Sequence, residues 1–168
     1  MNSKDTFEWF YKKEMTRAEV EVLEEEKELL YRAFYDAHRK PAAGLLTFLN
    51  DLRSRGIKTA LATSAGPGNI DFIVDGLGIR DQFDEIIGGA EVTKGKPDPE
   101  IYVKAAALVG VAPEDCWVIE DSLQGIASGL TAGARVVGIT TSHTAQELAH
   151  TQLIAPNFIG LYDQIASL

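Results

Sequence analysis

The hydrophobic pattern changes along the chain from a helical period to short apolar runs. Over residues 1–40, apolar positions recur at steps of three and four, which is typical of amphipathic helices. Thr16 and Glu19 have the spacing of a capping box and predict a helix start. Residues 41–55 continue the helical period, and Gly56 predicts the end of that helix.

Beyond Gly56, short apolar runs alternate with helical stretches. We predict strands at residues 57–62, 85–88, 116–119 and 135–139, with a brief last one at 153–154. We predict helices at residues 69–77, 98–109, 122–132 and 158–168, and a short one opened by a capping box at Thr144 and Glu147. Asp98 is the expected N-cap of the helix at 98–109, and Pro99 its first helical residue.

This alternation predicts an α/β fold with a Rossmann-like, mainly parallel sheet of four or five strands, covered by helices on both faces. The length of 168 residues suits one compact domain with a small appendage. We therefore expect a helical segment at residues 1–40 and an α/β segment at residues 41–168.

Composition and charge narrow the functional classes. Apolar residues at 45% and charged residues at 24% exclude a disordered chain and a disulfide scaffold. A single cysteine, the lack of a secretory signal and the lack of a long apolar run favour a cytoplasmic protein without membrane contact. The net charge of −9 disfavours nucleic acids as partners. An anionic substrate would need local cations or a bound metal.

Polar side chains follow three of the predicted strands. Thr63 and Ser64 follow the first strand, Lys96 comes after the second, and Glu120 and Asp121 end the third. Ligands of an open parallel sheet bind beyond the carboxyl ends of its strands, so we expect these residues near one another. Each has a plainer interpretation as well: a helix N-cap, a surface lysine, or a turn carboxylate.

Together the three groups suit phosphoryl transfer. Adjacent carboxylates suit Mg²⁺, which is commonly held by one or two carboxylates with water and phosphate oxygens. A hydroxyl and free N–H groups at a helix start suit a phosphate, and a lysine opposite neutralises the charge of a transferring phosphoryl group. No nucleophile is evident at these strand ends.

The order and spacing of these motifs resemble the haloacid dehalogenase superfamily, especially its β-phosphoglucomutase-like and phosphoglycolate-phosphatase-like members. Residues 57–64, 95–102 and 118–126 are similar to its second, third and fourth motifs. The resemblance implies that the Thr63 hydroxyl and the Ser64 N–H bind the transferring phosphoryl group. It implies that Lys96 contacts this group and the nucleophile, and that Asp121, with Glu120, ligates Mg²⁺.

One motif of that superfamily has no counterpart in the sequence. The superfamily's nucleophile and general acid/base form an Asp-x-Asp pair on a first strand, which lies between the strands that here end at Thr63 and Glu120. We find no such pair on an apolar strand, and residues 1–40 resemble the last helices of the helical cap. We therefore expect unpaired backbone on two central strands. A fragment, a start placed too late and a truncated relative would each explain this.

For the full-length parent, the resemblance implies Mg²⁺-dependent phosphoryl transfer through an aspartyl-phosphate. The expected enzyme is a phosphatase or sugar phosphomutase, and its substrate a small phosphorylated metabolite such as a sugar phosphate. The alternative is a truncated, inactive member that acts as a binding or oligomerisation module, with a homo-oligomer as one form. A response-regulator receiver also groups acids, a hydroxyl and a lysine, but there the acids precede the lysine.

Overall fold

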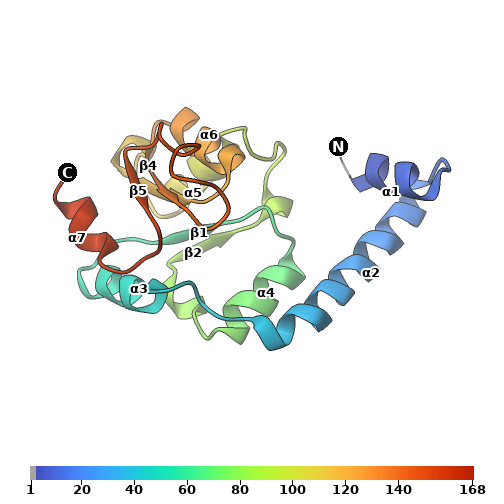
Figure 1. Ribbon diagram of the computed structural model, residues 1–168, viewed down its shortest axis with the longest axis horizontal. Coiled ribbons are helices and arrows are strands. Elements are labelled where there is room, and N and C mark those ends of the chain that lie inside the picture. The colour runs from blue at the N-terminus through green and yellow to red at the C-terminus, as the bar shows by residue number, and fades with distance from the viewer. Residues whose placement is uncertain (1–2) are drawn as a thin grey trace. The chain divides into compact units, whose positions relative to one another are not determined.

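The computed structural model describes residues 3–168. The chain divides into two compact units, residues 1–39 and residues 40–168. The first unit is helical, whereas strands and helices alternate in the second (Figure 1). None of the helices in the described part of the chain has the length and apolar character that a membrane span requires.

The first unit consists of helices α1 (Ser3–Tyr11) and α2 (Arg17–Tyr35), which pack against each other, and a 3₁₀ turn. The predicted capping box begins α2. Thr16 Oγ1 accepts a hydrogen bond from Glu19 N at 3.3 Å, and the Glu19 carboxylate accepts one from Thr16 N at 2.8 Å. Phe34 at the end of α2 remains 78% exposed, so the apolar surface of this unit is only partly covered.

The second unit contains the strands and the remaining helices. Its strands are β1 (Ala60–Ala62), β2 (Glu85–Ile87), β3 (Trp117–Glu120), β4 (Arg135–Ile139) and β5 (Leu153–Ala155). Its helices are α3 (Leu45–Ser54), α4 (Pro67–Gly76), α5 (Glu100–Leu108), α6 (Leu123–Thr131) and α7 (Leu161–Ala166). The predicted α/β architecture is confirmed.

The strands form two sheets rather than the single sheet that we predicted. One sheet has the order β1-β2 and the other β3-β4-β5, and every pairing is parallel. Within residues 3–168, β1 pairs only with β2, and β3 only with β4. Each of these two strands therefore keeps one edge without a strand partner, as expected for the strands that end near Thr63 and Glu120.

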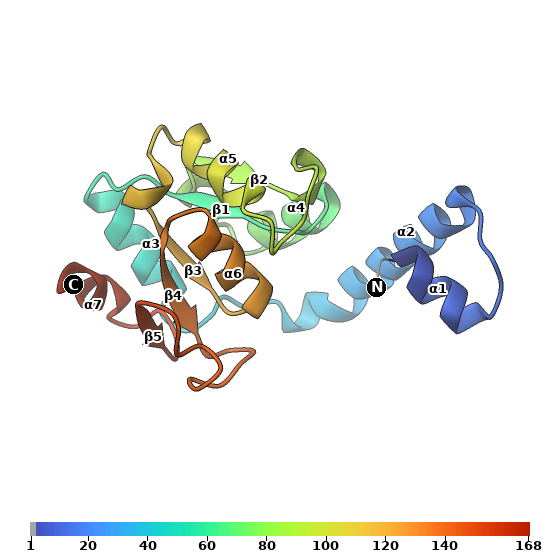
Figure 2. The ribbon, with the colours of Figure 1, turned by 90° about the horizontal axis from the view of Figure 1, so that it is seen from above.

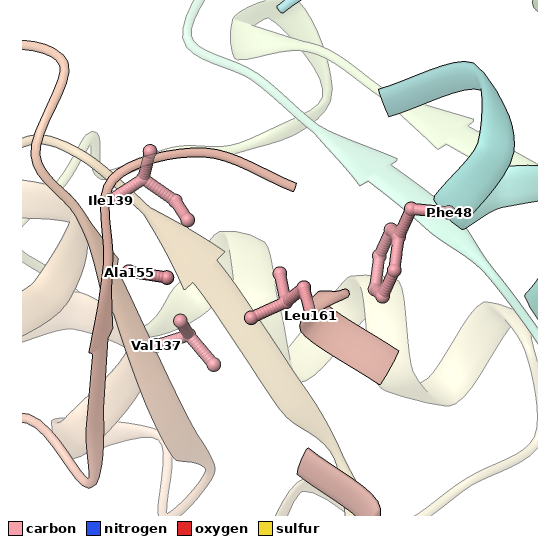
Figure 3. Packing of buried hydrophobic residues seen from close by; sticks show 5 residues of the cluster. All are labelled: Phe48, Val137, Ile139, Ala155 and Leu161. Atoms are coloured by element: carbon pink, nitrogen blue, oxygen red, sulfur yellow. The ribbon is translucent and has the colours of Figure 1, made fainter. Parts of the chain in front are cut away.

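Strand β4 is buried on both faces, which is why its sequence is a continuous apolar run. On one face, Val136 belongs to a core cluster with Ile126 of α6. On the other, Val137 packs with Phe48 of α3 and Leu161 of α7 (Figure 3). Helix α6 and the pair α3 and α7 accordingly lie on opposite sides of this sheet (Figure 2).

The starts of α5 and β1 differ from the predicted ones, because side chains form hydrogen bonds with the backbone at both places. Helix α5 begins at Glu100, and Pro99 rather than Asp98 is its N-cap, while Asp98 Oδ1 accepts from Glu100 N at 3.1 Å. The strand predicted at 57–62 begins only at Ala60, because Thr59 N donates to the carboxylate of Asp84 at 2.9 Å instead of joining a regular ladder.

Two predicted helices differ more strongly. The capping box at Thr144 and Glu147 forms, but residues 144–150 continue as turns and the predicted helix is wrong. Thr151 Oγ1 donates to Leu148 O at 2.9 Å and closes this segment. The helix predicted at 158–168 begins at Leu161, because Gly160 takes a left-handed conformation with φ of 63°.

Candidate functional site

The carboxyl ends of β1 and β3 meet at Lys96. Its Nζ donates to Ala62 O, the last carbonyl of β1, at 3.3 Å, and also forms an ion pair with Glu120 at the end of β3. Thr63 N donates to Ile87 O of β2 at 3.0 Å, so Ala62, one residue earlier, directs its carbonyl towards the free edge of β1. Lys96 therefore links the carboxyl ends of β1 and β3.

Lys96 and Glu120 form a largely buried ion pair. Their side chains are only 12% and 10% exposed. Tyr102 of α5 belongs to the same cluster, since its hydroxyl donates to Glu120 Oε1 at 2.5 Å and its ring centroid lies 4.9 Å from Lys96 Nζ. The ammonium therefore rests between a carboxylate and an aromatic face, an arrangement that holds a buried cation in place.

The second oxygen of Glu120 is occupied by the start of α6. Glu120 Oε2 accepts from Asp121 N and Ser122 N, both at 3.2 Å, and from Ser122 Oγ at 3.0 Å. Ser122 is the N-cap of α6, and its Oγ also accepts from Gly125 N at 3.0 Å. With Lys96 and Tyr102 on Oε1, the Glu120 carboxylate accepts five hydrogen bonds and ties β3 to α5 and α6.

This environment sets the protonation states of Glu120 and Tyr102. Burial alone would raise the pKa of Glu120, but the hydrogen bonds from Lys96 and Tyr102 hold it below its usual value. Burial, together with the charge of Glu120, raises the pKa of Tyr102 far above its usual value. Tyr102 therefore keeps its proton and remains a hydrogen-bond donor at neutral pH.

The carboxylate of Asp121 faces a different loop from that of Glu120. Asp121 Oδ2 accepts from Thr141 Oγ1 at 2.9 Å and from Ser142 Oγ at 2.5 Å, both in the loop that follows β4. No hydrogen bond within residues 3–168 reaches Asp121 Oδ1, so this oxygen is available to a ligand. The two adjacent carboxylates thus differ: Glu120 is saturated by protein donors and Asp121 is not.

Thr63 and Ser64 begin the loop between β1 and α4. Thr63 Oγ1 accepts from Ala65 N at 3.1 Å, which leaves the hydroxyl hydrogen of Thr63 free to donate to a ligand. Thr63 is half-buried and Ser64 is exposed. Because Thr63 follows directly after Ala62, the carbonyl that Lys96 contacts, the hydroxyl and the lysine belong to the same end of β1.

The proline-containing loop that carries Lys96 is held from both sides. The peptide bond between Lys96 and Pro97 is cis. Ser128 of α6, which is fully buried, donates from Oγ to Asp98 O at 2.7 Å. Before the lysine, the Glu100 carboxylate accepts from Thr93 N at 3.0 Å. The position of Lys96 therefore depends on contacts with α5 and α6.

The carboxylate of Asp121 fits a magnesium ion in its chemistry. Mg²⁺ takes oxygen ligands and is commonly held by one or two carboxylates, with the remaining positions filled by water and phosphate. Asp121 Oδ1 offers such an oxygen, whereas both oxygens of Glu120 are already hydrogen-bonded. Asp121 is the better direct ligand of the two. Within residues 3–168 no three His, Cys, Asp or Glu side chains gather into a complete metal site.

Several contacts of this site were not predicted from the sequence. Tyr102, Thr141 and Ser142 were not among the expected site residues. Position in the sequence could have predicted Thr141 and Ser142, since they follow a strand at the same carboxyl edge as Thr63. Tyr102 lies on a helix, and its contact with Glu120 depends on how that helix packs.

We expect Gly125→Ala to destabilise the protein by about 1–3 kcal/mol, because a Cβ atom there would clash with the carboxylate of Glu120. Five hydrogen bonds oppose the movement of that carboxylate. Chemical unfolding measures the difference. Gly95→Ala is the control, since a Cβ at Gly95 meets nothing within 4 Å. Equal stability of the two variants would contradict a fixed Glu120.

We expect Glu100→Gln to destabilise the protein at neutral pH but not at low pH. Hydrogen bonds from Lys104, Thr93 N and Lys94 N lower the pKa of Glu100 to about 2. A lowered pKa in the folded state means that this carboxylate stabilises the fold above about pH 4.5, and that the gain disappears as the pH falls towards 2. Urea unfolding of both proteins between pH 7 and pH 2.5 tests this. A difference that stays constant with pH would contradict the prediction.

Comparison with known proteins gives consistent matches. A family model described as a haloacid dehalogenase-like hydrolase matches residues 1–133. The β-phosphoglucomutase of Bacillus subtilis is 40% identical over 96 residues, which are 57% of this chain and 42% of that protein. The bifunctional riboflavin kinase/FMN phosphatase of Arabidopsis thaliana is 36% identical over 101 residues, 60% of this chain and 27% of that protein.

Solved structures extend the likeness over most of the chain. A hydrolase of family IA, variant 3, from Entamoeba histolytica superimposes with a TM-score of 0.86 at 32% identity, covering 94% of this chain and 74% of that one. The chain spans less than half the length of the two curated relatives named above.

Proposed function

The chain belongs to the haloacid dehalogenase-like hydrolases, and we propose that it is the phosphoryl-transfer core of a Mg²⁺-dependent enzyme that acts on a small phosphorylated metabolite. The observation that carries this proposal is the position of Lys96, which joins the carboxyl ends of β1 and β3. A phosphoryl group at this edge would meet the lysine, the Thr63 hydroxyl and the Asp121 carboxylate together.

Each residue has a role that follows from its chemistry. The Thr63 hydroxyl and the Ser64 N–H donate to the phosphoryl oxygens and hold the group at the start of α4. Lys96 neutralises negative charge on the transferring group, and the Glu120 carboxylate with the Tyr102 hydroxyl keeps its ammonium in place. Asp121 holds the magnesium ion, which when bound neutralises phosphate charge and orients the substrate.

The nucleophile is proposed to lie on an extended segment that pairs with the free edges of β1 and β3. In that position a carboxylate at the carboxyl end of the segment would lie beside Lys96. Its oxygen would attack phosphorus, and the substrate oxygen would leave as an alcohol after taking a proton from the second carboxyl group of the Asp-x-Asp pair. Water would then attack the acyl phosphate, which would release inorganic phosphate and restore the first carboxylate. We expect the 168-residue chain alone to give no turnover, since no strand within residues 3–168 pairs with the free edges of β1 and β3.

The substrate is proposed to be a sugar phosphate or a similar phosphomonoester. The names of the two relatives, a β-phosphoglucomutase and an FMN phosphatase, support a phosphorylated small molecule. The helices α1 and α2 are proposed to be part of a cap that selects the substrate, as cap segments do when they close over a site.

The test uses a fusion protein in which an extended segment carrying the family's Asp-x-Asp motif precedes residue 1. We expect this fusion protein to release phosphate from a panel of sugar phosphates and FMN. We expect EDTA to stop the reaction and added Mg²⁺ to restore it. A fusion with Asn-x-Asn in the added segment is the matched control. Phosphate release that survives EDTA, or no release at all, would contradict the proposal.

A non-catalytic binding module is the second candidate, favoured by the free edges of β1 and β3. Such a module would bind Mg²⁺ and phosphate, or pair with another chain, without turnover. The fusion protein distinguishes the two candidates, because a binding module would remain inactive after the Asp-x-Asp segment is supplied.

A further inference from the structure

The carboxylate of Asp121 is anchored by one oxygen and free at the other. Thr141 Oγ1 and Ser142 Oγ both donate to Oδ2, at 2.9 Å and 2.5 Å. Within residues 3–168, Oδ1 accepts no hydrogen bond. A carboxylate held in this way presents a single fixed oxygen in a defined direction.

The loop that supplies these hydroxyls has its own internal support. Thr144 N donates to Glu147 Oε2 at 2.9 Å, and Glu147 N donates to Thr144 Oγ1 at 3.4 Å. Leu148 at the end of the loop is fully buried in the core beside β4. The loop is thus shaped by contacts that do not involve Asp121.

The same loop borders open space at the edge of the sheet. Residues 140–145 and 147 line a hollow of about 550 Å³. Strands β3 and β4 are neighbours, so the loop after β4 and Asp121 after β3 lie at adjacent strand ends. Thr141 and Ser142, which line this hollow, are the same residues that hydrogen-bond Asp121.

We propose that Thr141 and Ser142 are positioning residues for the metal ligand Asp121, an inference that rests on the proposed function. Side chains that hydrogen-bond a metal-binding carboxylate restrict its rotation and keep its free oxygen directed at the ion. Removal of such partners commonly weakens metal binding by about 10–100-fold. Thr141 and Ser142 supply this restraint through two hydroxyls from one ordered loop.

The test measures Mg²⁺ binding by the 168-residue chain directly. The amide signals of Asp121 and Ser122 are followed by ¹H–¹⁵N NMR during titration with MgCl₂, which yields a Kd even for weak binding. We expect Thr141→Val with Ser142→Ala to raise the Kd at least about tenfold. Thr140→Val, in the same loop but outside the hydrogen bonds to Asp121, is the matched control and should leave the Kd unchanged.

A conservative variant separates positioning from a merely structural role. Thr141→Ser with Ser142→Thr keeps both hydroxyls, and we expect it to bind Mg²⁺ as the parent chain does. The unfolding midpoint of each variant is measured alongside. A loss of stability with an unchanged Kd would overturn the inference, since only the fold would then depend on these hydroxyls.

The variant Asp121→Asn distinguishes failure of this inference from failure of the proposed function. If Asp121→Asn loses Mg²⁺ binding while the double variant stays within twofold of the parent chain, the positioning role is overturned and the proposed metal ligand stands. If the parent chain does not bind Mg²⁺, or Asp121→Asn binds it equally well, the metal ligand itself is wrong and the inference falls with it.

Discussion

We expect Asp121→Asn to lower the turnover of the fusion protein by about a thousandfold or more. A metal ion that stabilises phosphoryl charge contributes several kcal/mol to catalysis, and a loss of about 4 kcal/mol corresponds to about a thousandfold in rate. Phosphate release under saturating substrate and Mg²⁺ measures the effect. The exposed Asp163 in α7 provides the control, since Asp163→Asn should retain full turnover. A variant at Asp121 that kept a tenth of the activity would contradict its role.

Asp121 gives a cleaner test of catalysis than Lys96. We expect Lys96→Ala to abolish turnover of the fusion protein and to destabilise its fold as well, because removal of Lys96 would leave the Glu120 carboxylate without its counter-ion. The hydrogen bonds of the Asp121 side chain, by contrast, come from two exposed hydroxyls.

We expect Glu120→Ala to destabilise the protein by about 3–5 kcal/mol. The substitution leaves the Lys96 ammonium buried without a counter-ion and removes the acceptor of five hydrogen bonds. The free energy of unfolding in urea measures the loss. Lys94→Ala is the control: Lys94 is 73% exposed and its ion pair with Asp98 spans 3.6 Å, so we expect less than about 1 kcal/mol.

A double-mutant cycle shows how much of this loss belongs to the pair itself. Lys96→Met and Glu120→Gln each break the ion pair and leave the remaining charged side chain without its counter-ion. The double variant removes both charges, so we expect its cost to be smaller than the sum of the two single costs by about 1–3 kcal/mol. Simple additivity would mean that the two side chains do not stabilise each other.

The sequence predicted the strands best where the fold buries both faces. The run at 135–139 matches β4 residue for residue, because a strand covered by α6 on one side and by α3 and α7 on the other must be apolar throughout. The start of β1 was predicted too early, because Asp84, 25 residues away in the chain, hydrogen-bonds Thr59. Hydrogen bonds between residues far apart in the chain leave no periodic pattern of apolar residues in the sequence.

The site was predicted through position along the strands, and its internal arrangement was not. Thr63, Lys96, Glu120 and Asp121 lie at or after strand ends, so the topology rule for parallel sheets predicts that they share one edge. The sequence treats Glu120 and Asp121 as equivalent neighbours. Their environments differ because α5 packs so that Tyr102 reaches Glu120. How a helix packs against a sheet cannot be predicted from its residue types alone.

The free edges of β1 and β3 have a consequence for hydrogen–deuterium exchange. Residues in a strand direct their N–H groups alternately to either side. In β1, Leu61 donates towards β2, while Ala60 and Ala62 face the side without a strand. Protection should therefore alternate from one amide to the next along β1 and β3, whereas β4, between two partners, should be protected throughout. If an extended segment docks there, the fast amides of β1 and β3 will become slow.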